Sequence, residues 1–394
     1  MTRHLLALAL ALASTLAQAA PISYWKLDLL HSFDDGPGGH HPHGGLVESP
    51  AGVFWGTTND GGADGGAGTV YKFVPGSAPV VMRTFYADNE LGAHPSAGLL
   101  ADGSMFYGTT SQGGYPDMGT VFRISADGQF AMMHEMDGLD GRRPYAPLAR
   151  GADGALYGGN FYGGANDLGT LFRMDASGAF TVLHAFQPLR SGNDGAHPEG
   201  RLVQHKNGFF YGTSLGGIHG AGSVFRISPT GAFTSLHSFQ GGSSANGCEP
   251  RTGLALDAAG NFVGTNRLCG SANGGTLFSL TASGTAGLMH TFDNSVVYGS
   301  DPSGDLIRRS DGRFYGVTRG GSPGCGSVYA KSPGLSGTYT RLFSFPVDRS
   351  KGCFPRGRLT SAADGALYGT TELGGAFDKG TIFRLRKVSN YPDH

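Results

Sequence analysis

Short hydrophobic runs alternate with stretches rich in glycine, aspartate and asparagine along the whole chain. Runs such as 119–122, 183–186 and 380–383 contain β-branched, aliphatic and aromatic residues, and turn-forming residues bound them on both sides. Short segments of this composition between turn signals are typical of β-strands. The pattern therefore predicts an all-β chain built from many short strands.

The segments recur as one unit that is present seven times, at intervals of 50–54 residues. The first marker of the unit is a large residue before a glycine, at positions 55, 107, 157, 211, 263, 315 and 368. The second is Gly-Thr or Gly-Ser, an aliphatic residue and then an aromatic one, at positions 71, 122, 172, 225, 278, 329 and 383. The third is Gly-x-x-Pro-x-x-x-Leu, with proline at positions 42, 95, 144, 198, 250, 302 and 355. The fourth is a run similar to Leu-His-Ser-Phe, which ends at positions 33, 85, 136, 186, 239, 292 and 345.

Four strands in a unit of this length match a four-stranded propeller blade, so seven units predict a seven-bladed β-propeller. Asp-Gly and Asn-Gly pairs such as 102–103 and 207–208 predict tight hairpin turns at one end of each blade. The longer connections emerge at the other end, and this loop-rich face is where we expect function.

The two ends of the chain predict how the ring closes. The last unit stops after its third strand, at 380–387, and an unpaired fourth strand lies near the start of the chain, at 26–33. We expect the N-terminal strand to complete the last blade and to cover its open edge. A solenoid, the competing repeat architecture, does not need such complementary ends.

The units resemble those of the Gloeo-Verruco (GloVer) tandem-repeat family of bacteria, which read roughly Leu-Tyr-Gly-Thr-Thr, a glycine loop, Gly-Thr-Val-Phe, Leu-His-Ser-Phe and Pro-x-x-x-Leu. The resemblance covers nearly all of the chain after residue 19 and is clear in 106–124 and 367–385. It implies an exported, propeller-like repeat protein and no particular catalytic activity. Members often carry a C-terminal sorting anchor; we recognise none here and expect a released or periplasmic protein.

Residues 1–19 are expected to form a signal peptide, because a basic start at Arg3 precedes an apolar stretch, 5–16, and the small residues Ala17 and Ala19. Residues 20–394 would then be a single secreted propeller domain. Glycine accounts for 69 of 394 residues, which fits many tight turns. The net charge of -1 argues against nucleic acid as a partner, and we expect neither membrane insertion nor a cofactor, and a monomeric chain.

Four cysteines lie in the last three units: Cys248, Cys269, Cys325 and Cys353. An even number in an exported chain favours two disulfides, although four cysteines allow three connectivities. The topology favours Cys248 with Cys269 and Cys325 with Cys353, since each pair joins a connection between blades to a nearby loop on one face. A metal site is the alternative, and no Cys-x-x-Cys spacing supports it.

The residue before each proline of the third marker, here called the pre-proline residue, is expected near the mouth of the central channel. The seven are His41, His94, Arg143, His197, Glu249, Asp301 and Phe354, of which the first six are candidate ligand-binding residues. If their role were only structural, one residue type would suit all seven blades. Their divergence permits a polar site with an anionic ligand on the side of the imidazoles and Arg143, although drift from a histidine consensus is the alternative.

His40, His41 and His43 are weak candidates for metal ligands, since Zn, Cu or Ni accepts imidazole nitrogen. His41 shares its repeat position with His94 and His197, so repeat consensus explains part of this cluster, and we predict no metal. Calcium at 59–64 is a further possibility that turn-forming residues also explain.

Motifs for a nucleophile elbow, a metalloprotease helix or a phosphate loop were not found in the sequence. Our first hypothesis is therefore a non-enzymatic recognition or scaffold propeller that binds an envelope or extracellular ligand on its loop-rich face. The alternative is a secreted hydrolase or lyase with its active site at the channel mouth. A purely structural or matrix role is the third.

Overall fold

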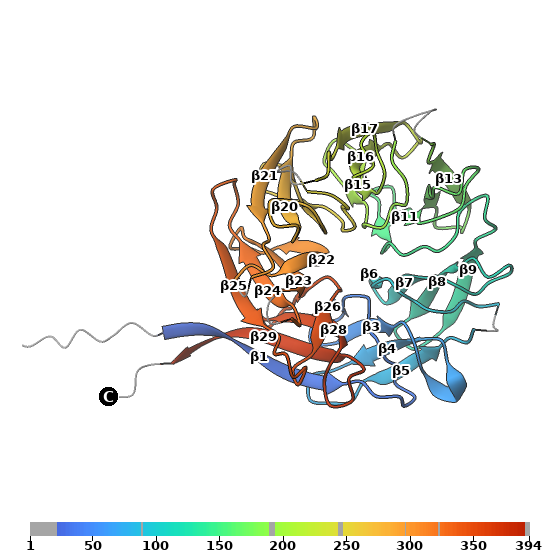
Figure 1. Ribbon diagram of the computed structural model, residues 1–394. Helices are drawn as coiled ribbons and strands as arrows, with labels where there is room; N and C mark the ends of the chain where they lie inside the picture. The colour runs from blue at the N-terminus through green and yellow to red at the C-terminus, as the bar shows by residue number, and fades with distance from the viewer. Residues whose placement is uncertain are drawn as a thin grey trace, which may run out of the picture.

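The computed structural model describes residues 22–87, 90–188, 194–242, 247–295, 297–321 and 324–390, and the predicted signal peptide lies outside these residues. The described residues form seven antiparallel sheets arranged as the blades of a ring (Figure 1). This confirms the predicted seven-bladed β-propeller. A single 3-10 turn, η1 (Ala63–Gly65), is the only helical element in the described part of the chain. No helix among those residues is long and apolar enough to cross a membrane.

The strands of each blade run from the channel outward in chain order. Blade 1 contains β2 (Val47–Glu48), β3 (Phe54–Thr58), β4 (Thr69–Phe73) and β5 (Val80–Thr84), and blade 2 contains β6 (Leu100–Asp102), β7 (Met105–Thr110), β8 (Thr120–Ser125) and β9 (Phe130–Glu135). Blade 3 contains β10 (Ala149–Arg150), β11 (Leu156–Asn160), β12 (Thr170–Met174) and β13 (Phe180–Ala185), and blade 4 contains β14 (Val203–Gln204), β15 (Phe210–Ser214), β16 (Ser223–Ile227) and β17 (Phe233–Ser238). Blade 5 contains β18 (Ala255–Leu256), β19 (Phe262–Asn266), β20 (Thr276–Leu280) and β21 (Ala286–Thr291), and blade 6 contains β22 (Ser300–Arg308), β23 (Phe314–Gly320), β24 (Ser327–Lys331) and β25 (Tyr339–Ser344).

Blade 7 is assembled from both ends of the chain. Its inner position is shared by β26 (Cys353–Pro355) and β27 (Thr360–Ser361), followed by β28 (Leu367–Leu373), β29 (Thr381–Asn390) and the N-terminal β1 (Ile22–Ser32). In Figure 1, β1 and β29 run side by side as the blue and red strands. Their antiparallel register extends from Ile22 opposite Asn390 to Ser32 opposite Thr381. This confirms the predicted closure, with a longer pairing than the 26–33 segment expected from the sequence.

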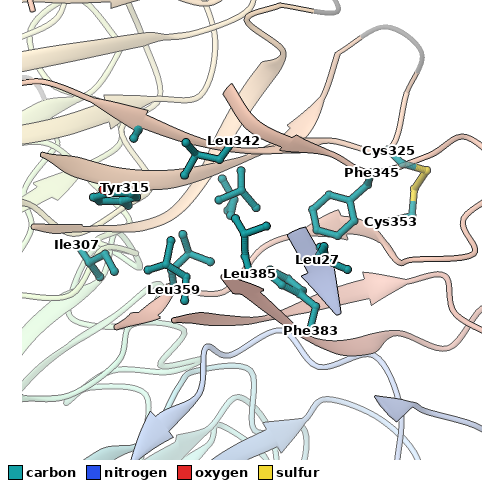
Figure 2. Close-up of a cluster of buried hydrophobic side chains, with 14 residues drawn as sticks. Leu27, Ile307, Tyr315, Cys325, Leu342, Phe345, Cys353, Leu359, Phe383 and Leu385 are labelled. Carbon is teal, nitrogen blue, oxygen red and sulfur yellow. A yellow bond between two sulfur atoms is a disulfide. The ribbon is translucent and has the colours of Figure 1, made fainter. Parts of the chain in front are cut away.

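The closing strand is fixed by burial as well as by hydrogen bonds. Leu27 of β1 is buried in one cluster with Phe383 and Leu385 of β29 and with side chains of blade 6 (Figure 2). Full burial of a large apolar side chain contributes roughly 1.5–3 kcal/mol. The cluster therefore joins β1 to β29 of its own blade and to blade 6.

The glycine of the first marker has a packing role. A Cβ added at Gly108 would lie 2.4 Å from the ring of Phe122, and the equivalent glycines of the other units meet the second-marker aromatic in the same way. The tip of the aromatic side chain on the third strand thus lies against the glycine of the second strand. This close approach explains why the two markers occur together in every unit.

A backbone contact repeated at every blade junction positions the pre-proline residues. All seven have a positive φ, between 53° and 58°, although none is glycine. The N–H of each donates to a carbonyl of the preceding blade, as from His94 to Ala67 and from Phe354 to Cys325. Left-handed backbone in a residue with a side chain costs roughly 1 kcal/mol or more. The hydrogen bond between blades offsets this cost.

Both predicted disulfides are present. Cys248 of the connection into blade 5 is bonded to Cys269 of the β19–β20 loop, and Cys325 of blade 6 is bonded to Cys353 of blade 7. The second bond therefore links adjacent blades, and its two cysteines belong to the same buried cluster as Leu27, here called the closure cluster (Figure 2).

Candidate functional site

A cavity of about 350 Å³ occupies the central channel and is lined by residues from all seven blades. Its walls come mainly from two positions of each unit, the first and third residues after the proline of the third marker. In blade 7 these are Arg356 and Arg358, and in blade 1 they are His43 and Gly45. We call them the channel positions.

The wall formed by blades 4–7 is dense in charge. Six arginines line it, at positions 201, 251, 267, 319, 356 and 358. Three carboxylates also line the cavity, Glu199, Asp301 and Asp305, and two more, Glu249 and Glu372, reach its arginines. Six guanidinium groups thus face five carboxylates, which leaves one cation in excess.

Most of these charges are paired. Arg251 donates to Glu199 at 2.8 Å, Arg267 donates to Asp301 at 3.0 Å, and Arg319 donates to Glu372 at 2.7 Å. The Nε of Arg201 lies 3.3 Å from Oδ2 of Asp305.

Arg358 differs from the other five arginines. It has no carboxylate within 4 Å among the described residues, and its side chain is open to the cavity although protein surrounds the channel. Burial and the nearby charge of Arg201 lower the pKa of the Arg358 guanidinium to about 10, against a smaller opposing effect of Asp305. The group remains protonated at neutral pH, in a place where an anion would relieve this unfavourable environment.

Glu372 is held as a carboxylate. Burial opposes its ionisation, but the nearby imidazole of His43 and the charges of Arg319 and Arg356 outweigh burial and lower its pKa to about 2. His43 lies 3.6 Å from this carboxylate, yet burial and Arg356 lower the pKa of its imidazole overall. The pair is therefore neutral imidazole and charged carboxylate at pH 7.

The opposite wall is small and weakly polar. Gly45 of blade 1, Ser96 and Gly98 of blade 2, and Tyr145 and Pro147 of blade 3 fill the channel positions there. The cavity thus offers a cationic wall opposite an uncharged one. A ligand with one anionic group and one neutral face matches this arrangement.

The structure distributes the six predicted ligand-binding residues around the rim. Only Asp301 lines the cavity, where it accepts from Arg267, and Glu249 also lies 3.6 Å from Arg267. The imidazoles of His41 and His94 both contact the carboxylate of Asp60.

The remaining two predicted residues belong to blades 3 and 4. His197 stacks on Phe161, with ring centroids 4.8 Å apart, and Arg143 is half-buried at the rim. The cationic wall lies in blades 4–7, whereas the predicted imidazoles and Arg143 belong to blades 1–4, and ligand binding by these residues stays a prediction.

The weak metal candidates separate into two places. Nδ1 of His40 lies 3.2 Å from Nδ1 of His41, whereas the side chain of His43 lies in the channel beside Glu372. Asp60, which the sequence suggested only as part of a possible calcium site at 59–64, joins His40 and His41.

A family model described as the Gloeobacter/Verrucomicrobia repeat matches residues 21–217, 189–298 and 213–391. The chain belongs to this repeat family. The match confirms the resemblance drawn from the repeat markers. A comparison with curated proteins found no match.

Solved structures resemble this Gloeobacter/Verrucomicrobia repeat protein in fold. The extracellular domain of a protein named as a hybrid two component system from B. thetaiotaomicron gives a TM-score of 0.58 at 12% identity, over 91% of this chain and 40% of that chain. A one component system from the same organism gives 0.57 at 11% identity, over 91% and 39%. A protein named as a 6-phosphogluconolactonase from Bacteroides uniformis gives 0.53 at 16% identity, over 87% and 99%. This chain thus spans about two fifths of the first two chains, and identities this low show the fold alone.

In this Gloeobacter/Verrucomicrobia repeat protein, residues common to all units build strands and junctions, while residues of single units line the channel. The six arginines were missed in the sequence because we examined the residue before each proline. For four of the six, the signal lay in the variable residues after the proline, where glycine in some units is replaced by Arg201, Asp305 and Arg358 in others. The other two, Arg267 and Arg319, lie at the end of the second strand of their blades.

Proposed function

We propose that this protein is a secreted recognition propeller that binds a small carboxylate-bearing ligand, of the size of a sugar acid, in the central cavity. The observation that carries the proposal is Arg358, which lines a cavity of about 350 Å³ and has no carboxylate partner among the described residues. Pockets for small ligands begin at roughly 300 Å³. A guanidinium group recognises a carboxylate through two parallel hydrogen bonds.

Further support comes from the wall opposite the arginines and from proteins of similar fold. The small residues of blades 1–3 leave room for the neutral face of a sugar ring beside Tyr145. Propellers of this fold form the extracellular domains of two sensor-like proteins of B. thetaiotaomicron. The paired state of the channel carboxylates favours binding over acid catalysis, since general acids at neutral pH need a raised pKa and that of Glu372 is lowered.

Calorimetric titration of the mature protein with glucuronate, galacturonate and gluconate, and with glucose and galactose as neutral counterparts, tests the proposal. We expect at least one acid to bind and its neutral counterpart to bind at least tenfold more weakly. Arg358→Met should weaken binding of that acid by about ten- to a hundredfold, because a hydrogen bond to a charged group contributes roughly 1.5–3 kcal/mol.

Arg308→Met is the matched control, since it removes the same charge from an exposed arginine at the far end of β22. It should leave both binding and melting temperature unchanged. Equal affinity for acids and neutral sugars, or full binding by the Arg358 variant, would show that the proposal is wrong.

A further inference from the structure

Three potential metal ligands meet in blade 1, outside the central cavity. Nδ1 of His40 lies 3.2 Å from Nδ1 of His41, which lies 3.0 Å from Oδ2 of Asp60. All three ligand atoms lie within 4.8 Å of one another, and each side chain is partly exposed. Ligand atoms of one tetrahedral zinc ion are about 3.3 Å apart, given metal–ligand distances of about 2.0–2.1 Å. The two closest spacings in the cluster approach this value.

Hydrogen bonding alone does not satisfy these three atoms. Nδ1 of His41 has one site, yet it faces both an imidazole nitrogen and a carboxylate oxygen. If Nδ1 of His41 carries a proton and donates to Asp60, the lone pair of His40 Nδ1 has to share that same proton. If Nδ1 of His41 instead accepts a hydrogen bond from His40, its lone pair also faces the carboxylate oxygen, so that two acceptors meet. A cation placed among the three atoms accepts all three lone pairs at once.

The backbone holds the ligands in place before any ion binds. His40 and Asp60 form an antiparallel pair, with His40 N–H donating to Asp60 C=O at 2.8 Å and Asp60 N–H donating back at 3.2 Å. His41 is fixed on both sides, since its N–H donates to Lys379 and its C=O accepts from Asn59. A site whose ligands are positioned in this way binds its ion at a lower conformational cost.

Neighbouring groups orient the ligands. Nε2 of His40 lies 3.5 Å from Oδ1 of Asp35, and Oδ1 of Asp60 accepts from Asn59 at 2.9 Å and contacts Nδ1 of His94 at 3.1 Å. A carboxylate behind a ligating imidazole and hydrogen bonds on the free oxygen of a ligating carboxylate are typical of metal sites.

The same pair of positions in the other blades carries different residues. The equivalents of His40 and Asp60 are Ala93 with Gln112, Arg142 with Tyr162, Ala196 with Leu215, Cys248 with Leu268, Ser300 with Gly320, and Cys353 with Leu373. The blade architecture therefore does not require imidazole or carboxylate there. Blade 1 alone brings two imidazoles and a carboxylate together at this place among the described residues.

We propose that blade 1 binds one divalent transition-metal ion of the zinc type through His40 Nδ1, His41 Nδ1 and Asp60 Oδ2, with a coordination position open to solvent. Two nitrogen ligands and one oxygen ligand select zinc, cobalt, nickel or copper over magnesium and calcium. The site lies close to the channel mouth, because His43, two residues along the chain, lines the cavity. It does not depend on the ligand proposed above.

The test uses the mature protein after chelator treatment and dialysis. Titration with ZnCl2, followed by elemental analysis, should give one equivalent of tightly bound zinc. Co2+ in its place should produce visible absorption bands of a low-coordinate site, and Cu2+ should show nitrogen couplings from two imidazoles in electron paramagnetic resonance. These spectra require no variant, and their absence would overturn the proposal.

Two variants copy residues that blade 2 carries at the same positions, so they are expected to fold. His40→Ala follows Ala93 and Asp60→Gln follows Gln112. Each should lower zinc affinity at least tenfold, while His219→Ala, which removes an exposed histidine of the β15–β16 loop, should leave it unchanged. Equal zinc affinity in the wild type and both ligand variants, with loss in the His219 variant, would assign binding to adventitious surface histidine and contradict the site.

Discussion

At one position of every blade, the fold fixes the backbone conformation of a residue but not the identity of its side chain. The pre-proline residue has left-handed φ in every blade, yet it is histidine, arginine, glutamate, aspartate or phenylalanine. The hydrogen bond of its N–H to the preceding blade is a backbone contact that every side chain at this position permits. The side chain can therefore vary between blades.

Histidines of the outermost strands have a different role, because several stack on an aromatic residue of the next blade. His134 stacks on Phe180 and His290 stacks on Tyr339 with ring centroids 3.8 and 4.3 Å apart. Burial, with a smaller effect of Lys331, lowers the pKa of His290 to about 4, and its Nε2 is buried with no hydrogen-bond partner in the part of the chain that the structure describes. Folding therefore keeps this imidazole neutral in mildly acidic solution.

His290→Phe should make stability less dependent on pH. The unfolded state binds a proton below its pKa of about 6.5 while the folded state does not until about pH 4, so this histidine costs stability as pH falls between these values. The wild type should lose ~2 kcal/mol more than the variant between pH 7 and pH 4.5. Phe343 fills the same position in blade 6, which indicates that phenylalanine fits. Urea denaturation at several pH values measures the difference, and identical pH profiles would contradict it.

Among the elements, β1 is the one that converts an open series of blades into a ring. Its partner β29 would otherwise present an unpaired edge, which invites pairing with another chain. The register of β1 on β29 shifts between Leu29 and His31, and Leu27 before this shift belongs to the closure cluster.

Leu27→Ala should destabilise the protein by about 2–4 kcal/mol, because removal of a buried leucine side chain from a packed cluster costs that much. Leu139→Ala, at a side chain that is 76% exposed, is the matched control and should change the free energy of unfolding by less than about 0.5 kcal/mol. Chemical denaturation measures both. Equal stability of the two variants would mean that β1 does not contribute to closure.

The sequence was sufficient to predict the blades and their closure but not the site. Strand number and tight turns followed from markers that recur in every unit, because repeated packing demands repeated residues, and both disulfides followed from where the repeat places the four cysteines. The site depends on residues that differ between units, and which of them meet depends on local backbone. His43 follows His41 by only two residues, yet its side chain lies in the channel. Asp60, 19 residues from His41, is the residue that lies beside the imidazoles of His40 and His41.

At the scale of the whole molecule, the seven blades have equivalent backbones but carry different charged, metal-ligating and cysteine side chains. The arginines gather in blades 4–7, the imidazole and carboxylate cluster belongs to blade 1, and both disulfides lie in blades 5–7. Equivalent geometry means that a feature found at one junction can be transferred to another.

Ala67→Cys with Ala93→Cys should create a third disulfide, between blades 1 and 2. These alanines are the repeat equivalents of Cys325 and Cys353, whose Cα atoms lie 4.5 Å apart. The same hydrogen bond joins both junctions, from His94 N–H to Ala67 C=O and from Phe354 N–H to Cys325 C=O. Non-reducing mass spectrometry of the oxidised variant should show six cysteines paired in three bonds.

The new bond should raise the free energy of unfolding by ~3 kcal/mol, the chain-entropy value for a loop of this length. Both alanines are buried, so Ala67→Ser with Ala93→Ser, which adds atoms at the same places without a bond, separates the effect of packing from that of the cross-link. Thiols that stay free under oxidising conditions would show that the first and sixth junctions are not equivalent. Formation of the bond without stabilisation over the serine variant would show instead that blades 1 and 2 already remain associated in the unfolded chain, because a cross-link adds nothing where its two ends are not separated.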